Sequence, residues 1–194
     1  DIVVTNPPFS LFRDYVALLM QYNKQFAIIG NQNAITYREI FPLIKSNKIW
    51  LGYNNGHYWF MVPDSYEEKK TDFKIDESGQ KWRRMGNICW FTNLDIEKRH
   101  EDMTLFRTYS PDIYPKYDNY DAIEVSKTAD IPCDYDGYMG VPITFMQYYN
   151  PEQFEIAGLD DHRVEWVGHG PRLNGKVKYR RVIIRRKQVN INEN

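Results

Sequence analysis

The chain has 194 residues, a formal net charge of −1 and 42% hydrophobic residues. This length is sufficient for one buried core but short for two independent domains. The near-zero charge excludes a protein whose whole surface is basic, so any surface that binds nucleic acid must be local. The two cysteines lack metal-binding spacing, and no apolar run is long enough to span a membrane. We therefore expect a reduced cytoplasmic protein with no metal and no membrane partner.

The first thirty residues have the pattern of a strand, a helix and a second strand. Residues 1–5 are largely apolar, and apolar side chains then recur at helical spacing over residues 11–22. Residues 26–30 form a continuous apolar run, which is typical of a strand covered on both faces in a parallel sheet. Because a strand at the very first residue has neither an initiator Met nor a lead-in segment, we expect residues preceding Asp1 to be missing from this polypeptide.

The rest of the chain predicts further strands around a mixed sheet. A capping-box pattern at residues 36–39 predicts an irregular helix interrupted at Pro42, and the charged stretch 63–86 predicts a long loop. Residues 142–146 predict a turn or short helix. Strands are expected at residues 49–52, 58–62, 87–92, 154–158 and 182–184. We therefore expect an α/β fold with a mixed, mostly parallel sheet and a β-rich C-terminal extension, divided into residues 1–108 and 109–194.

The segment Asn6-Pro7-Pro8-Phe9 carries the strongest chemical signal. It follows a predicted parallel strand, and open α/β sheets bind ligands at that edge. The prolines hold the turn rigid, so that the Asn6 side-chain oxygen and the Pro7 carbonyl could each accept one hydrogen of an aromatic amino group. Phe9 could stack on the ring that carries this group. The alternative interpretation is a plain turn between a strand and a helix, because Asn and Pro favour turns.

Residues 1–10 resemble motif IV of N6-adenine methyltransferases. Five further segments are similar to the EcoRI-type adenine-specific DNA methyltransferase family: residues 26–31, 49–53, 87–93, 141–146 and 153–158. This resemblance implies a partial Rossmann-like methyltransferase fold, S-adenosylmethionine as methyl donor, and an adenine flipped out of duplex DNA beside Asn6 and Phe9. It also implies a restriction-modification enzyme, with a cognate restriction endonuclease as a functional rather than a physical partner. Trp90 or Phe91 could stack on the flipped base; the alternative is that both pack in the sheet.

The chain departs from the family pattern in one respect. The glycine-containing turn that cradles the methionine part of the cofactor, and the acidic residue that binds its ribose, belong upstream of motif IV and are absent there. We therefore expect this chain to bind S-adenosylmethionine weakly or not at all and to be inactive alone. A sheet lacking its first strands would expose an edge and an apolar face, so self-association is expected.

A local basic segment near the C-terminus predicts contacts with DNA phosphates. Its candidates are Lys178, Arg180, Arg181, Arg185, Arg186 and Lys187, with Lys176 just before them. A solvated strand with arginines on its exposed face explains the pattern equally well. A second basic group comprises Lys69, Lys70, Lys81, Arg83 and Arg84. Two other functions remain open: methylation of RNA or of a protein glutamine, and a non-catalytic DNA-binding or assembly module.

Overall fold

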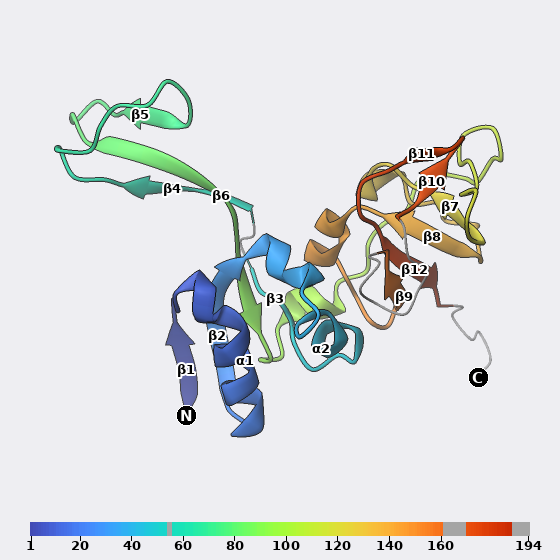
Figure 1. Ribbon diagram of the computed structural model, residues 1–194, viewed down its shortest axis with the longest axis horizontal. Coiled ribbons are helices and arrows are strands. Elements are labelled where there is room, and N and C mark those ends of the chain that lie inside the picture. Colours follow the sequence, from blue (N-terminus) through green and yellow to red (C-terminus); the bar gives the residue numbers. More distant parts are fainter. Residues whose placement is uncertain (54–55, 161–169, 188–194) are drawn as a thin grey trace. The chain divides into compact units, whose positions relative to one another are not determined.

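The computed structural model describes residues 1–53, 56–160 and 170–187 (Figure 1). The chain divides into two compact units, and each has its own sheet. Unit 1 consists of residues 1–34 and 51–92, and unit 2 consists of residues 35–50 and 93–194. The division that the sequence suggested, after residue 108, falls within unit 2.

Unit 1 is built on a six-stranded mixed sheet. β1 (Ile2–Thr5) and β2 (Gln25–Asn31) pair in parallel, which confirms the predicted strand, helix and strand unit. β6 (Lys81–Thr92) pairs antiparallel with β2, and β3 (Trp50–Leu51) lies next to β6. The prediction of a mostly parallel sheet is wrong, because the strands after β2 return without the helical crossovers that parallel pairing needs.

The helix α1 (Phe12–Gln21) covers one face of this sheet, after the short 3-10 helix η1 (Phe9–Leu11). Its buried side chains recur at helical spacing and are Phe12, Val16 and Leu19. The Phe12 ring centroid lies 4.9 Å from that of Phe91 on β6. A Cβ atom at Gly30 would lie 2.5 Å from the Phe12 ring, so α1 can pack this closely only because residue 30 has no side chain.

A three-stranded arm projects from the sheet of unit 1 (Figure 1). β4 (Gly56–Met61) and β5 (Phe73–Ile75) both pair antiparallel with the first part of β6. The prediction of a loop over residues 63–86 is therefore wrong for β5 and for the start of β6. Both faces of the arm are open to solvent, so its strands lack the apolar and polar alternation by which a half-buried strand is recognised.

The predicted irregular helix is shorter than expected. Residues 32–36 form the 3-10 helix η2 (Gln32–Thr36), and α2 (Phe41–Lys45) begins only at Phe41. Pro42 thus lies in the first turn of α2, where a helix tolerates proline because the missing N–H has no helical partner. The capping-box pattern therefore does not mark the start of this helix.

Unit 2 contains a four-stranded sheet in the order β7, β8, β12, β9, which confirms the expected β-rich C-terminal part. β7 and β8 are parallel, whereas β12 is antiparallel to both of its neighbours. Residues 143–147 form the 3-10 helix η5, as predicted. The strand bounds are β7 (Ala122–Glu124), β8 (Tyr138–Val141), β9 (Phe154–Leu159) and β12 (Val182–Arg186).

The remaining elements of unit 2 are short. β10 (Arg172–Leu173) and β11 (Lys176–Val177) form a small hairpin, and η3 (Glu97–His100) and η4 (Thr128–Asp130) are single 3-10 turns. In the portion of the chain that the structure describes, no helix has the length and apolar character needed to cross a bilayer.

Candidate active site

The Asn-Pro-Pro-Phe turn follows β1 directly and joins it to η1. Pro7 is buried, whereas Asn6 is exposed and Phe9 retains 44% of its accessible surface. Pro8 is extended, with φ −54° and ψ 131°, and its carbonyl accepts a hydrogen bond of 2.9 Å from the Leu11 amide. One proline therefore anchors the turn in the core and the other starts the helix, which leaves the side chains of Asn6 and Phe9 at the surface.

The turn lies at the edge where the two parallel strands end. Thr5 pairs with Ile28, so Asn6 is level with Ile29 one strand away. Ile29 in turn pairs with Trp90 on β6. At about 4.8 Å per strand, the backbones at Asn6 and Trp90 are about 10 Å apart across the sheet. The sheet thus brings Asn6 and Trp90 to the same level.

Gln32 is a polar residue at this edge that the sequence did not single out. It follows β2 immediately, is 7% exposed, and its Nε2 atom has no hydrogen-bond acceptor among the described residues. A buried amide nitrogen without an acceptor costs about 1–3 kcal/mol, so such groups require an explanation. No sequence motif marks a single glutamine after a strand as a site residue, so Gln32 can be recognised only from its position and burial in the fold.

Trp90 and Phe91 differ in their suitability for contact with a base. Phe91 is fully buried against Phe12, so its ring is part of the core beneath α1. Trp90 is partly exposed and, because side chains alternate along a strand, lies on the sheet face opposite to Phe91. The expectation that Phe91 stacks on a flipped base is therefore wrong, since the ring is inaccessible. Trp90 remains a candidate.

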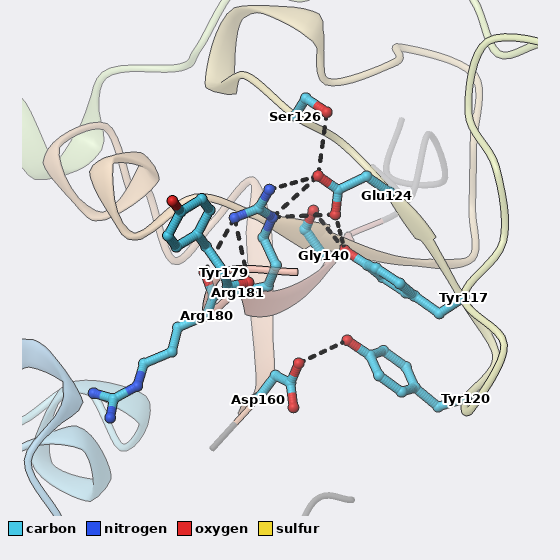
Figure 2. A network of polar contacts seen from close by, with 9 residues as sticks. All are labelled: Tyr117, Tyr120, Glu124, Ser126, Gly140, Asp160, Tyr179, Arg180 and Arg181. Atoms are coloured by element: carbon cyan, nitrogen blue, oxygen red, sulfur yellow. Dashed lines mark hydrogen bonds and ion pairs between the residues drawn. The ribbon is translucent and has the colours of Figure 1, made fainter. Parts of the chain in front are cut away.

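The basic segment of unit 2 is divided between the surface and the interior. Arg181 is buried at 8% exposure and forms a bidentate ion pair with Glu124 on β7, with Nη2 to Oε1 at 2.5 Å (Figure 2). Tyr117 and Ser126 also donate hydrogen bonds to the Glu124 carboxylate. Arg181 therefore serves the interior of the fold, and the expectation that it contacts DNA phosphate is wrong because its guanidinium is fully engaged.

Burial opposes ionisation of the Glu124 carboxyl, but the hydrogen bonds from Arg181, Tyr117 and Ser126 outweigh it and lower the pKa of this group. Burial and the hydrogen bond to Glu124 raise the pKa of the Tyr117 hydroxyl, which stays protonated and donates. Near this network, Tyr120 donates to Asp160 Oδ2 at 3.2 Å (Figure 2). The cluster is a charged, hydrogen-bonded part of the core of unit 2.

The other basic candidates lie nearer the surface. Lys178, Arg180 and Lys187 are exposed, and Arg180 donates to the Thr36 hydroxyl at 2.9 Å. Arg185 and Arg186 are partly exposed. Both have protein partners: Arg185 Nη2 lies 2.8 Å from Glu155 Oε2, and Arg186 donates to the Cys133 carbonyl. A shallow pocket is lined by Asp136, Glu155, Arg185, Arg186 and Lys187. This pocket, Lys178 and Arg180 provide the accessible cations of the segment.

Neither cysteine is in a disulfide, and burial raises the pKa of the Cys89 thiol to about 12. Over residues 1–53, 56–160 and 170–187, no cluster of three or more His, Cys, Asp or Glu side chains is arranged to hold a metal ion.

The rigid Asn-Pro-Pro-Phe turn stands at the carboxyl end of a parallel strand and leads into a helix, the setting expected for motif IV of an amino-methyltransferase. The profile of the family described as "Adenine-specific methyltransferase EcoRI" matches residues 1–187. Since this match covers nearly the whole chain, the chain belongs to that family.

Individual relatives agree with the family assignment. The chain is 50% identical over 197 residues to the Type II methyltransferase M.EcoRI of Escherichia coli. This alignment covers 97% of this chain and 58% of that protein. It is 41% identical to M.MgeORF184P of Mycoplasma genitalium and 40% identical to M.MpnI of Mycoplasma pneumoniae, in each case over 97% of this chain and 65% of the relative. The chain thus spans about three fifths of the length of these relatives. No solved structure matches it.

Proposed function

We propose that this chain supplies the amino-group clamp of an S-adenosylmethionine-dependent DNA adenine-N6 methyltransferase of restriction-modification type, built on a partial Rossmann-like sheet. The observation that carries the proposal is the turn after β1, where Asn6 and Phe9 are exposed on a backbone fixed by Pro7 and Pro8. Membership of an adenine-specific methyltransferase family supports the choice of adenine.

The chemistry follows from the acceptors at the turn. The lone pair of an adenine amino group is delocalised into the ring, so the nitrogen is a poor nucleophile until hydrogen bonds make it more tetrahedral. In the proposal, the Asn6 side-chain oxygen and the Pro7 carbonyl each accept one amino hydrogen. No general base is needed, because the nitrogen becomes strongly acidic after methyl transfer and then releases its proton. Phe9 stacks on the base, and Trp90 is the second stacking candidate.

The described residues fit the methyl end of the cofactor better than the rest of it. Carbonyl and amide oxygens suit a cationic sulfonium, and S-adenosylmethionine, when bound, supplies the methyl group. The chain has a Gly-x-Gly sequence, Gly168-His169-Gly170, but it lies far downstream of β1 and mostly outside the described residues. We therefore propose that this chain alone binds the cofactor weakly.

The proposed substrate, duplex DNA, would contact the accessible cations of the basic segment. Lys178, Arg180 and Lys187 are the principal phosphate contacts in this proposal. β1 pairs with β2 as its only partner among the described strands, and its Ile2 and Val4 side chains are 54% and 65% exposed. An unpaired strand edge with apolar side chains favours self-association of the isolated chain.

The proposal is tested with the full natural coding sequence, wild type and with Asn6→Ala, by transfer of labelled methyl groups to adenine-containing duplex DNA. Loss of one preorganised polar contact to the reacting group costs about 10²–10³-fold in kcat. We expect that loss for Asn6→Ala, with DNA affinity unchanged. Gln25→Ala, which removes an exposed amide at the opposite end of β2, is the matched control and retains wild-type activity.

The alternatives give different results in the same assay. Transfer to RNA or to a glutamine-containing peptide, with none to DNA, would replace the DNA substrate. DNA binding without methyl transfer or cofactor binding in the full-length protein would identify a non-catalytic module. Full activity of Asn6→Ala would refute the clamp itself.

A further inference from the structure

The arm of unit 1 rises from the same sheet edge as the Asn-Pro-Pro-Phe turn. β2 ends at Asn31, which pairs with Ile88, and β6 runs antiparallel to β2. The part of β6 that precedes Ile88 therefore continues past the end of β2, on the side where Asn6 leaves β1. At about 3.3 Å per residue, the segment from Lys81 to Ile88 carries the arm about 23 Å beyond that edge. Any substrate held at the turn lies beside the base of this arm.

One face of the arm combines aromatic rings and cations. Cross-strand partners share a face, and Trp59 pairs with Arg84 while Trp82 pairs with both Met61 and Lys74. The Lys74 ammonium confirms this placement, because it lies 4.7 Å from the Trp59 ring and 5.8 Å from the Trp82 ring. We call this the cationic face, and it consists of Trp59, Met61, Lys74, Trp82 and Arg84.

The opposite face is also open to solvent. Phe60, Ile75 and Met85 are 40%, 49% and 43% exposed, and Met61 on the cationic face is 67% exposed. A surface helix or sheet normally hides such side chains on one face, yet here they are exposed on both, although Tyr66 of the loop after β4 stacks on Phe73 of the opposite face. A ribbon with accessible side chains on both faces fits a partner that surrounds it.

The charges on the arm are arranged for an anionic partner. The three strands carry Lys74 and, at the start of β6, Lys81, Arg83 and Arg84, and none of these strands contains an acidic residue. The acidic residues lie in the connecting loops. Lys81, which lies 3.9 Å from Glu68, is only 20% exposed, whereas both side chains of the Arg84–Asp72 pair, at 3.4 Å, are exposed. Exposed pairs of this kind contribute little, so a phosphate can displace the carboxylate.

We infer that the arm is a groove-binding element for duplex DNA, in which its cations contact the phosphates and its exposed Met and aromatic side chains contact the bases. The major groove is about 12 Å wide and admits a two-stranded β-ribbon, which is what β4 and β6 form over residues 84–88, where β5 does not pair. Apolar side chains recur where proteins wedge base steps apart. A base that leaves the stack to reach Asn6 requires such unstacking nearby. The inference rests on the proposed function for its location, but the binding it describes is independent of catalysis.

The test measures binding of a fluorescent duplex by the full natural protein as a function of salt. The double variant Lys74→Gln/Arg84→Gln removes two cations from the cationic face. We expect affinity to fall about tenfold or more, and the slope of log K against log salt to decrease by about 1.8, since each lost phosphate contact removes about 0.9. Lys24→Gln, an exposed cation at the opposite end of β2, is the matched control and changes neither quantity.

Two further variants separate the causes. Lys74→Arg/Arg84→Lys keeps both charges, so it is expected to bind DNA like wild type if the charges carry the binding. Thermal unfolding of every variant reports whether the arm still folds. Met61→Ala preserves the charges and is expected to weaken binding without changing the salt slope. Unchanged affinity and slope in the double glutamine variant would overturn the inference. The inference would also be overturned if the double glutamine variant lost self-association, measured by light scattering, but still bound DNA. That result would make a second copy of the chain the partner of the arm.

Failure of this inference and failure of the proposed function are distinguishable. If the arm does not bind DNA, the double glutamine variant binds as wild type while Asn6→Ala still abolishes methylation. If the clamp is wrong but the arm binds DNA, Asn6→Ala retains activity while the double glutamine variant still loses affinity.

Discussion

Arg181 Nη2 lies 2.5 Å from Glu124 Oε1 in the interior of unit 2, and the two side chains are only 10% and 4% exposed. Removing one partner of such a buried pair leaves an uncompensated charge, which costs about 3–5 kcal/mol. We expect Glu124→Gln to lower the free energy of unfolding by this amount in urea titrations. Glu155→Gln, which breaks the exposed pair with Arg185, is the control and is expected to cost less than about 1 kcal/mol. Equal effects of the two variants would contradict this assignment.

The Glu124 carboxyl also makes the free energy of unfolding depend on pH in the acidic range. Because the hydrogen bonds lower the pKa of Glu124 below its ordinary value of 4.5, the unfolded chain takes up a proton first as the pH falls. The stabilisation is therefore complete above pH 4.5 and is lost as the pH falls through the folded-state pKa. Urea midpoints measured from pH 6 downward should decline more steeply below pH 4.5 in wild type than in Glu124→Gln. Parallel declines would argue against this linkage.

Trp90 and Phe91 are expected to respond oppositely to truncation. Phe91→Ala removes a fully buried ring that packs on Phe12, and such changes cost about 3–5 kcal/mol. Trp90→Ala should cost less stability but lower methylation of DNA, since the partly exposed indole lies level with Asn6. Thermal unfolding and methyl-transfer assays on the full natural protein separate the two. Loss of activity in both variants at unchanged stability would contradict the core position of Phe91.

Gln32 is expected to matter for activity more than for stability. Its Nε2 atom is buried without an acceptor among the described residues, so Gln32→Leu should leave the free energy of unfolding unchanged or raise it. If the amide contacts substrate or cofactor, the same variant lowers kcat or raises KM in the methylation assay. A variant that is destabilised by more than about 1 kcal/mol would instead show that the amide is satisfied within the protein.

The exposed cations of the basic segment should set part of the salt dependence of DNA binding. Lys178→Gln/Lys187→Gln is expected to reduce the slope of log K against log salt by about 1.8 and to weaken binding to all sequences alike. Lys48→Gln, an exposed cation elsewhere in unit 2, serves as the control. A changed sequence preference in the double variant would point to base contacts rather than phosphate contacts.

The sequence predicted the elements whose side chains are sorted clearly between core and solvent. β1, α1 and β2 follow from apolar runs and helical spacing, because each buries a well-defined set of residues. The Asn-Pro-Pro-Phe turn could also be predicted from the sequence, since proline restricts the backbone regardless of tertiary contacts. Its position at the end of a parallel strand is confirmed.

The misjudged features depend on partners that are distant in sequence. Arg181 is followed by arginines of the same appearance at residues 185 and 186, and only its pairing with Glu124, 57 residues earlier, reveals that it is buried. Phe91 and Trp90 are adjacent aromatics, and which one is accessible depends on the face that α1 covers. A loop was predicted for residues 63–86 of the arm because a strand exposed on both faces has no regular alternation of apolar and polar residues.

β6 contributes one continuous backbone to both the sheet core and the arm, with β2 along its last residues and β4 and β5 along its first. Inserting or deleting one residue within it would turn every following side chain to the other face, exchanging Phe91 for Trp90 beneath α1. Variation in length during divergence should therefore be confined to the turns at residues 62–72 and 76–80, while β6 keeps its twelve residues. An arm that must adapt to a new DNA sequence can change its side chains and its tip, but not the length of the strand that carries it.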